Sequence, residues 1–169
     1  MKITVKLNQG QLPKKYGKFG DAADFKGAYP LRSFPISIYE QPAQTASFAL
    51  TLIDPDSIPV AGFSWIHWTA ANLPGDLTEI PENSSQKPPF SMIQGKNSTA
   101  SPYIQEKDPL ICQHYVGPTP PQGVHNYELR IYSLDQKLAL APGFWMNELL
   151  HAMEGHILTH QKIILPYRG

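Results

Sequence analysis

The sequence predicts a mainly β protein, an antiparallel sandwich with a C-terminal helical segment, folded as a single domain over residues 1–169. Three observations support this prediction. Several short segments alternate apolar and polar residues with the period of two that half-buried strands show. Most of the 17 prolines lie between those segments, where they favour turns and argue against long helices. Only near residue 141 does the apolar period lengthen to that of a helix.

The predicted strands follow one another along the chain, separated by turn-forming connectors. Alternation starts within the first seven residues and returns in residues 33–39 and 46–54. In residues 63–74 apolar side chains fill both faces, which is typical of a strand inside a sheet. Three further segments are predicted as strands: residues 111–116 with the weakest pattern, residues 125–135 with the clearest, and residues 162–167.

A helix is predicted within residues 141–158, where four apolar residues between positions 146 and 153 recur at helical spacing. Pro142 suits a first helical turn and Gly155 suits a stop. Residues 78–114 form the longest irregular stretch. Long ordered loops on a single domain often carry binding residues.

Composition excludes several classes of protein. Fourteen basic residues balance fourteen acidic ones, so no net field draws a nucleic acid or an anionic membrane. No segment reaches membrane-spanning length, and the N-terminus lacks the apolar core of a signal peptide. Cys112 is the only cysteine, which excludes an internal disulfide and fits a reducing compartment. We therefore expect a cytoplasmic protein with no membrane insertion and no nucleic-acid partner.

Polar residues near the ends of predicted strands are candidates for a binding site. In Asp54-Pro55-Asp56 the proline fixes its own backbone and biases Asp54 toward an extended conformation. Asp and Pro are also ordinary turn residues. His67 lies within an apolar strand, where it is either a hydrogen-bonded core residue or a ligand-binding group oriented by a carboxylate.

The residues that flank the proline-rich loop 117–123 supply further candidates. His125 and Tyr127 begin the apolar face of the strand at 125–135, so both are expected to point inward. They form either the floor of a pocket or a strand end that reaches water. Tyr115 precedes the loop, and Gly117 either lets the backbone approach a ligand or only turns the chain.

Taken together and in this order, the motifs resemble those of the phosphatidylethanolamine-binding protein family. The C-terminal end is similar to the bacterial and archaeal branch of that family, the Raf kinase inhibitor-like proteins. The resemblance covers nearly the whole chain. Its motifs are Asp-Pro-Asp at 54–56, the His67-Trp68 strand ending in Asn-Leu-Pro, the run Tyr-x-Gly-Pro-x-Pro-Pro-x-Gly-x-His-x-Tyr from Tyr115 to Tyr127, the segment from Ala152 to Leu158, and the ending near Arg168.

The resemblance implies a β-sandwich with a small pocket at one end that takes phosphate, phosphorylated head groups or similar anions. Histidine N–H groups are expected to donate to the anion, and both aspartates to orient and charge the histidines. A non-catalytic protein without metal or cofactor is implied, and a kinase or protease partner and a homodimer are left open. By position, the implied ligand-binding residues are Asp54, Asp56, His67, Tyr115, Gly117, Pro120, Pro121, His125 and Tyr127.

The sequence departs from the family pattern in two places. Asn126 stands where the family often has arginine, and strand alternation predicts that it points away from His125. The segment from Asp54 to Pro59 is one residue longer than usual, and this is expected to reshape one rim of the pocket.

Two alternatives use other chemistry. A metal-dependent hydrolase would use the two His and two Asp residues of the same cluster, although no close ligand spacing supports it. Thiol chemistry would use Cys112 and His114, although nothing in the sequence activates the sulfur and a buried inert cysteine is preferred. His151, His156 and His160 do not share one helical stripe, so packing or surface roles are expected for them.

Overall fold

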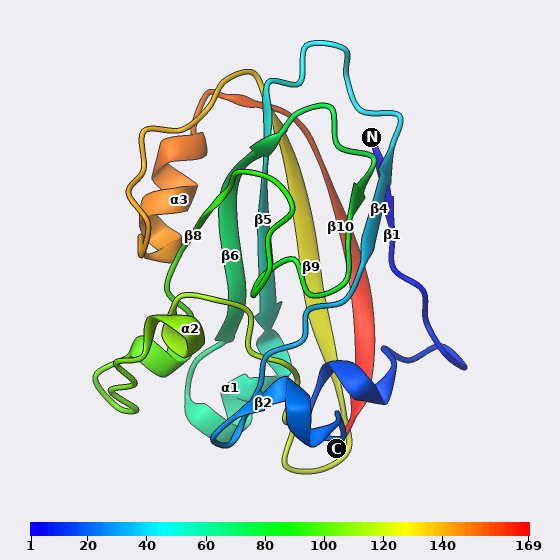
Figure 1. Ribbon diagram of the computed structural model, residues 1–169, viewed down its shortest axis with the longest axis vertical. Coiled ribbons are helices and arrows are strands. Elements are labelled where there is room, and N and C mark those ends of the chain that lie inside the picture. The colour runs from blue at the N-terminus through cyan, green and yellow to red at the C-terminus, as the bar shows by residue number, and fades with distance from the viewer.

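The computed structural model describes all residues, 1–169, and consists of two sheets with a helix on the outer side of the larger one (Figure 1). The larger sheet has the strand order β10-β9-β5-β6-β8, and the smaller has the order β1-β4-β7. Both sheets are antiparallel throughout, as the sequence predicts. The strands are β1 (Lys2–Thr4), β4 (Ile36–Tyr39), β5 (Ser47–Asp54), β6 (Trp65–Pro74), β7 (Glu79–Ile80), β8 (Ile93–Gln94), β9 (Val124–Leu134) and β10 (Ile157–Arg168), with a separate hairpin of β2 (Phe25–Lys26) and β3 (Tyr29–Pro30).

The main core lies between the two sheets. Leu50 of β5 and Leu129 of β9 face Ile36 and Ile38 of β4, and all four side chains are inaccessible to solvent. Ile36 and Ile38 are two residues apart, and this spacing turns both side chains to the same face of β4. Full burial of such a side chain contributes about 1.5–3 kcal/mol, so this layer is the main source of stability.

The opposite face of the larger sheet is covered by α3 (Met146–Met153) (Figure 1). Leu149 and Met153 of this helix belong to a second apolar cluster, which includes Ala49 of β5 and Ala71 of β6. Small alanine side chains on this face leave room for the helix to approach the sheet. The sandwich with a C-terminal helical segment is therefore confirmed.

The predicted bounds of the helix need one correction. The helix begins at Met146, four residues after Pro142, because the Glu148 carboxylate accepts a hydrogen bond from the Trp145 backbone N–H at 2.6 Å and fixes the first turn there. Gly155 follows the end of the helix with a φ of +78°, a conformation that suits glycine in the turn toward β10.

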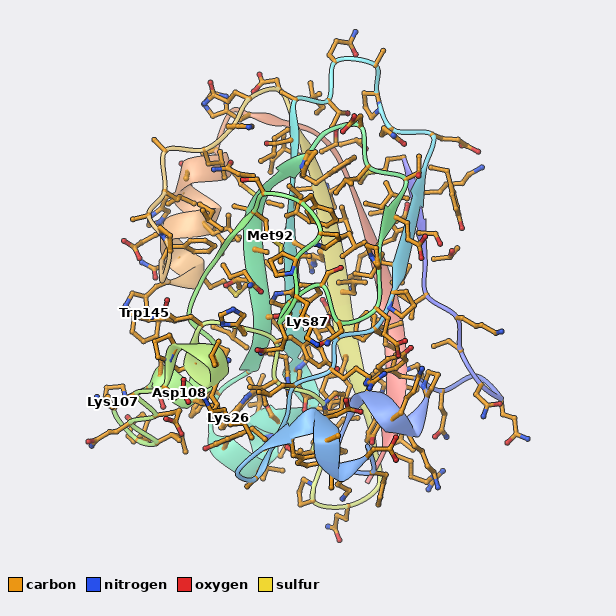
Figure 2. All side chains as sticks on the ribbon, viewed as in Figure 1. Lys26, Lys87, Met92, Lys107, Asp108 and Trp145 are labelled. Carbon is orange, nitrogen blue, oxygen red and sulfur yellow. The ribbon has the colours of Figure 1, made fainter.

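One predicted strand is absent and two others have different bounds. Residues 111–116 are not a strand: α2 (Pro109–Cys112) occupies their first part, and Asp108 begins that helix by accepting a hydrogen bond from the Leu110 N–H at 3.0 Å. An ion pair joins Asp108 to Lys26 of β2 (Figure 2). The first strand is shorter than predicted and ends at Thr4, whereas the last is longer because it pairs with β9 along almost its whole length.

Short helical turns gather near one end of the larger sheet, where α1 (Ile58–Ala61) lies at the same end of the molecule as the C-terminus in Figure 1. None of the helices has both the length and the apolar character needed to cross a membrane. The remaining turns are the 3-10 helices at Lys14–Tyr16, Ala22–Asp24, Pro55–Ser57 and Ser98–Ala100.

Candidate functional site

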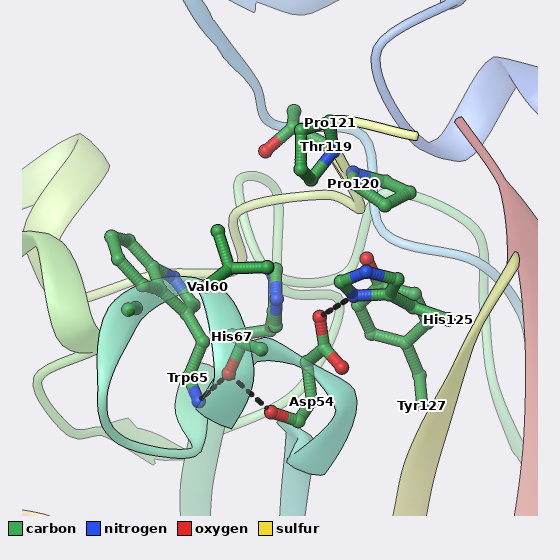
Figure 3. A pocket seen from close by; sticks show the side chains of 11 residues that line it. Asp54, Val60, Trp65, His67, Thr119, Pro120, Pro121, His125 and Tyr127 are labelled. Atoms are coloured by element: carbon green, nitrogen blue, oxygen red, sulfur yellow. Dashed lines mark hydrogen bonds and ion pairs between the residues drawn. The ribbon is translucent and has the colours of Figure 1, made fainter. Parts of the chain in front are cut away.

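A cavity of about 160 Å³ opens at the end of the larger sheet where β5 ends and β6 and β9 begin (Figure 3). β5 lies between the other two strands and runs antiparallel to both, so its last residue meets their first residues at one edge. The loop 117–123 closes the opposite side. We call this space the end cavity, and its walls are formed by Asp54, Ser57, Val60, Ala61, Trp65, His67, Thr119, Pro120, Pro121, His125 and Tyr127.

Asp54 and His125 form a buried pair at the base of the end cavity. The His125 Nδ1 lies 2.7 Å from the Asp54 Oδ2, and the two residues are 8% and 3% exposed. An ionised carboxylate only accepts hydrogen bonds, so His125 carries a proton on Nδ1 and its Nε2 is left for a ligand. This is the carboxylate–histidine arrangement that the sequence predicts for Asp54.

His67 is oriented by the backbone and not by a carboxylate. Its Nδ1 lies 2.7 Å from the carbonyl oxygen of Val116, which can only accept, so Nδ1 carries the proton. Burial lowers the pKa of His67 to about 4, despite opposing effects of the Val116 carbonyl and Asp54. The ring is therefore neutral at pH 7, and the expected charging of His67 by an aspartate is wrong for the cavity without ligand.

Tyr127 packs between the two histidines. Its ring meets His67 edge-on with centroids 5.0 Å apart and lies 6.4 Å from the ring of His125. Burial, followed by the negative charge of Asp54, raises the pKa of Tyr127 well above its usual value. The hydroxyl group therefore stays protonated and can donate a hydrogen bond.

The loop 117–123 is held on several sides by backbone contacts. The backbone N–H and the ammonium group of Lys18 donate to the carbonyls of Pro118 and Pro120 at 2.9 and 2.7 Å. At the far end of the loop, the N–H of Gly169 donates to the Gly123 carbonyl at 2.8 Å. These contacts, together with the fixed φ of proline, place Pro120 and Pro121 firmly against the end cavity.

Gly117 supports the loop but does not line the end cavity. Its N–H donates to the carbonyl of Pro30 at 2.8 Å and is therefore occupied. A Cβ atom at this position would lie 2.2 Å from the carbonyl oxygen of Tyr16, so glycine is needed for the close approach of two backbone segments. The expectation that the Gly117 amide faces a ligand is wrong for this reason.

Two other predicted residues also lie outside the end cavity. Asp56 is exposed, and its Oδ2 accepts hydrogen bonds from the backbone N–H and the side-chain amide of Asn126 at 2.8 and 3.0 Å. It therefore holds the start of β9 and orients no histidine. Tyr115 is fully buried in the core, where its hydroxyl group donates to the Tyr16 carbonyl at 2.6 Å.

Five residues of the wall are not among the predicted binding residues: Ser57, Val60, Ala61, Trp65 and Thr119. Ser57 is buried, donates to the Asp54 carbonyl at 2.6 Å and accepts from the Trp65 N–H at 2.8 Å, so it closes the turn between β5 and β6. Trp65 lies two residues before His67 on the same face of the strand. Strand alternation could therefore have identified Trp65 as a wall residue. Nothing in the sequence pattern marks the other four as wall residues.

An aromatic stack continues outward from the end cavity. The ring of Phe63 is stacked on Trp65 and on Tyr103, with centroids 5.8 and 6.3 Å apart. Tyr103 is 84% exposed, and Val60 on the cavity wall is 62% exposed. The mouth of the end cavity is therefore bordered by apolar surface on one side.

The alternative sites of the sequence find no further support in the structure. No group of three or more His, Cys, Asp or Glu side chains lies close enough to hold a metal ion. Burial raises the pKa of the Cys112 thiol, and the Nδ1 of His114 contacts the Pro109 carbonyl at 2.8 Å. The Nδ1 of His156 lies 3.0 Å from the carboxylate of Asp135, in the turn between α3 and β10.

Comparison with known proteins identifies relatives over almost the full length of the chain. A family model described as phosphatidylethanolamine-binding protein matches residues 2–168. The protein YxkA of Bacillus subtilis is 47% identical over 165 residues, which cover 98% of each chain. The crystal structure of a phosphatidylethanolamine-binding protein homolog from Chlamydia trachomatis gives a TM-score of 0.75 at 27% identity, covering 94% of this chain and 90% of the other. YbcL of Escherichia coli shares the fold with a TM-score of 0.76 at 21% identity, covering 99% and 97%.

Proposed function

Because the chain belongs to the phosphatidylethanolamine-binding protein family, we propose that it is a non-catalytic binding protein for small phosphorylated molecules or similar oxyanions. The ligand occupies the end cavity. Regulation of a kinase or protease partner, if the protein has one, would then depend on whether the cavity is filled.

The observation that carries this proposal is the buried Asp54–His125 pair with His67 beside it, all facing one cavity. Burying ionisable groups is costly unless they are paired, and perturbed groups in a concave site are a mark of functional sites. A purely structural role would not require both histidines to border the same open space.

The size of the cavity limits the ligand. A volume of about 160 Å³ is smaller than the roughly 300–1,000 Å³ typical of sites for drug-sized ligands. A phosphate or a small head group fits this space, and the remainder of a larger ligand would extend over the apolar border near Val60 and Trp65.

Binding of inorganic phosphate and of phosphoethanolamine, measured by calorimetry at pH 6, tests the proposal. We expect saturable binding to the wild type and a loss of at least about tenfold in affinity for His125→Ala, since a charge-assisted hydrogen bond of about 1.5–3 kcal/mol is removed. His160→Ala, an exposed histidine on β10, is the matched control and should bind normally. Equal affinity of His125→Ala and wild type would contradict the site, and no binding to wild type would contradict the function.

A further inference from the structure

We propose that the end cavity selects oxyanions that carry a proton, such as hydrogen phosphate and singly ionised phosphomonoesters, over sulfate and phosphodiesters, which carry none. The inference rests on the proposed function and names the ligand class of that same site. It follows from which atoms the cavity offers as hydrogen-bond donors and which it offers as acceptors.

Both histidines offer an acceptor to the ligand. The Nδ1 of His67 is engaged with the Val116 carbonyl and the Nδ1 of His125 with the Asp54 carboxylate, and neither partner can donate a proton. In a neutral imidazole the second nitrogen is then an unprotonated acceptor. The Nε2 of His67, whose ring is neutral at pH 7, therefore presents a lone pair to the end cavity, and the Nε2 of His125 does so in the neutral form of its ring.

The charges around the end cavity reinforce this preference. The titratable residues on its wall are Asp54, His67, His125 and Tyr127, and no lysine or arginine lines it. The second oxygen of Asp54, Oδ1, is buried without a hydrogen-bond partner, and the carboxylate accepts from the His125 Nδ1–H through Oδ2. Outside the wall, Asp56 is held by Asn126, and the ammonium group of Lys18 donates to the carbonyl of Pro120.

A protonated oxyanion satisfies this wall better than an unprotonated one. Its P–OH group donates to a histidine Nε2, while its other oxygens accept from wall residues that carry donors, namely Trp65, Thr119 and Tyr127. Sulfate has no such proton at neutral pH. It binds only if the imidazoles take up protons from solvent, and burial opposes this at His67.

Calorimetry with inorganic phosphate and with sulfate at pH 7, in two buffers of different ionisation enthalpy, measures affinity and proton uptake together. We expect phosphate to bind at least about tenfold more tightly, because a site built to accept a ligand O–H rejects an analogue without it. Sulfate should bind with net uptake of protons from the buffer, and phosphate with less. At pH 6, phosphoethanolamine should likewise bind more tightly than glycerophosphoethanolamine, its diester counterpart.

Equal affinities for phosphate and sulfate, without proton uptake by sulfate, would overturn the selectivity and leave the proposed function intact. Absence of binding by every one of these anions would overturn both. Ethanolamine lacks the phosphate. If it binds as tightly as phosphoethanolamine, the inference is also overturned, since the histidine acceptors would then bind the ammonium group of the ligand.

Asp54→Asn tests the positioning of the His125 proton. The asparagine amide can donate to Nδ1, which moves the imidazole proton to Nε2 and turns an acceptor into a donor. We expect the preference for phosphate over sulfate to fall below about threefold, with sulfate taking up fewer protons. Asp56→Asn removes the same charge outside the end cavity and should keep the wild-type preference. An unchanged preference in a folded Asp54→Asn variant would contradict the inference; if that variant does not fold, the proton counts of the wild type decide.

Discussion

The two histidines of the end cavity show how a single hydrogen-bond partner changes the electrostatic environment of an imidazole ring. His125 lies against a carboxylate and His67 against a backbone carbonyl, although both border the same space. Each contact holds the proton on Nδ1, so the tautomers agree while the charge environments differ. The lowered pKa of His67 comes first from burial, which penalises the imidazolium form.

A measurable consequence at the residue scale is acid sensitivity. The folded pKa of His67, about 4, lies below the unfolded value of 6.5. Between these values the unfolded chain binds a proton that the folded protein does not. Stability is therefore full above pH 6.5, falls as the pH drops toward 4, and loses about 3 kcal/mol from this group in total.

Urea unfolding of wild type and His67→Asn at pH 7 and pH 4.5 measures this effect. The wild type should lose about 2–3 kcal/mol more than the variant between the two pH values, because asparagine has no proton to take up in this range. His160→Asn, at an exposed position, should behave as wild type. A variant that loses as much stability as wild type would show that His67 is not the buried neutral group.

At the scale of elements, the loop 117–123 behaves as a rigid wall. Proline restricts its backbone, and contacts from Lys18 and Gly169 anchor it from two other segments of the chain. A loop already ordered before binding does not lose conformational entropy when the ligand arrives, so affinity is gained without further contacts. Under the proposed function, the prolines of this loop would favour binding by keeping the wall ordered.

Gly117→Ala tests this role of the loop. The added methyl group would lie 2.2 Å from the Tyr16 carbonyl oxygen, so the two backbones must separate, at a cost of about 1–3 kcal/mol in stability. We expect a lower melting temperature and weaker phosphate binding, because Pro120 and Pro121 move with the loop. Gly123→Asn is the control in the same loop: its φ of +72° suits asparagine and its Cβ would meet nothing within 4 Å. Unchanged melting and binding of Gly117→Ala would show that the loop adapts.

At the scale of the whole molecule, the two faces of the larger sheet pack against different elements. One face builds the core with the smaller sheet, and the other is covered by α3. The end cavity lies at the edge where β5, β6 and β9 meet, and no residue of α3 belongs to its wall. Stability contributed by the helix should therefore be separable from ligand binding.

Leu149→Ala tests this separation. Leu149 is fully buried under α3, so its truncation leaves a cavity and should cost about 2–5 kcal/mol in the free energy of unfolding. The phosphate affinity of the folded fraction should stay within about twofold of wild type, since sites without shared contacts are usually independent. Leu150→Ala, at an exposed position on the same helix, is the control for helix content. A parallel loss of affinity in Leu149→Ala would show that the helix and the cavity are coupled.

Local pattern was sufficient where one physical effect dominates. The period of two marked β4, β5, β6 and β9 because each buries one or both faces, and the helical period marked α3. The segment 111–116 was misjudged because a short helix begun by Asp108 competes with a weak strand pattern. Pro142 was misplaced in the helix because the contact of Glu148 with Trp145 decides where the first turn begins.

The sequence by itself determined the mainly antiparallel fold, the family, and the two strand ends that bring His67 and His125 toward one edge. Only the tertiary structure decided that Asp54 pairs with His125, that Asp56 accepts hydrogen bonds from Asn126, and that Gly117 packs against Tyr16. The physical reason is the separation along the chain of the residues that determine each feature. Strand periodicity is set by neighbours along the chain, whereas the proton positions in the end cavity depend on contacts between segments far apart in sequence.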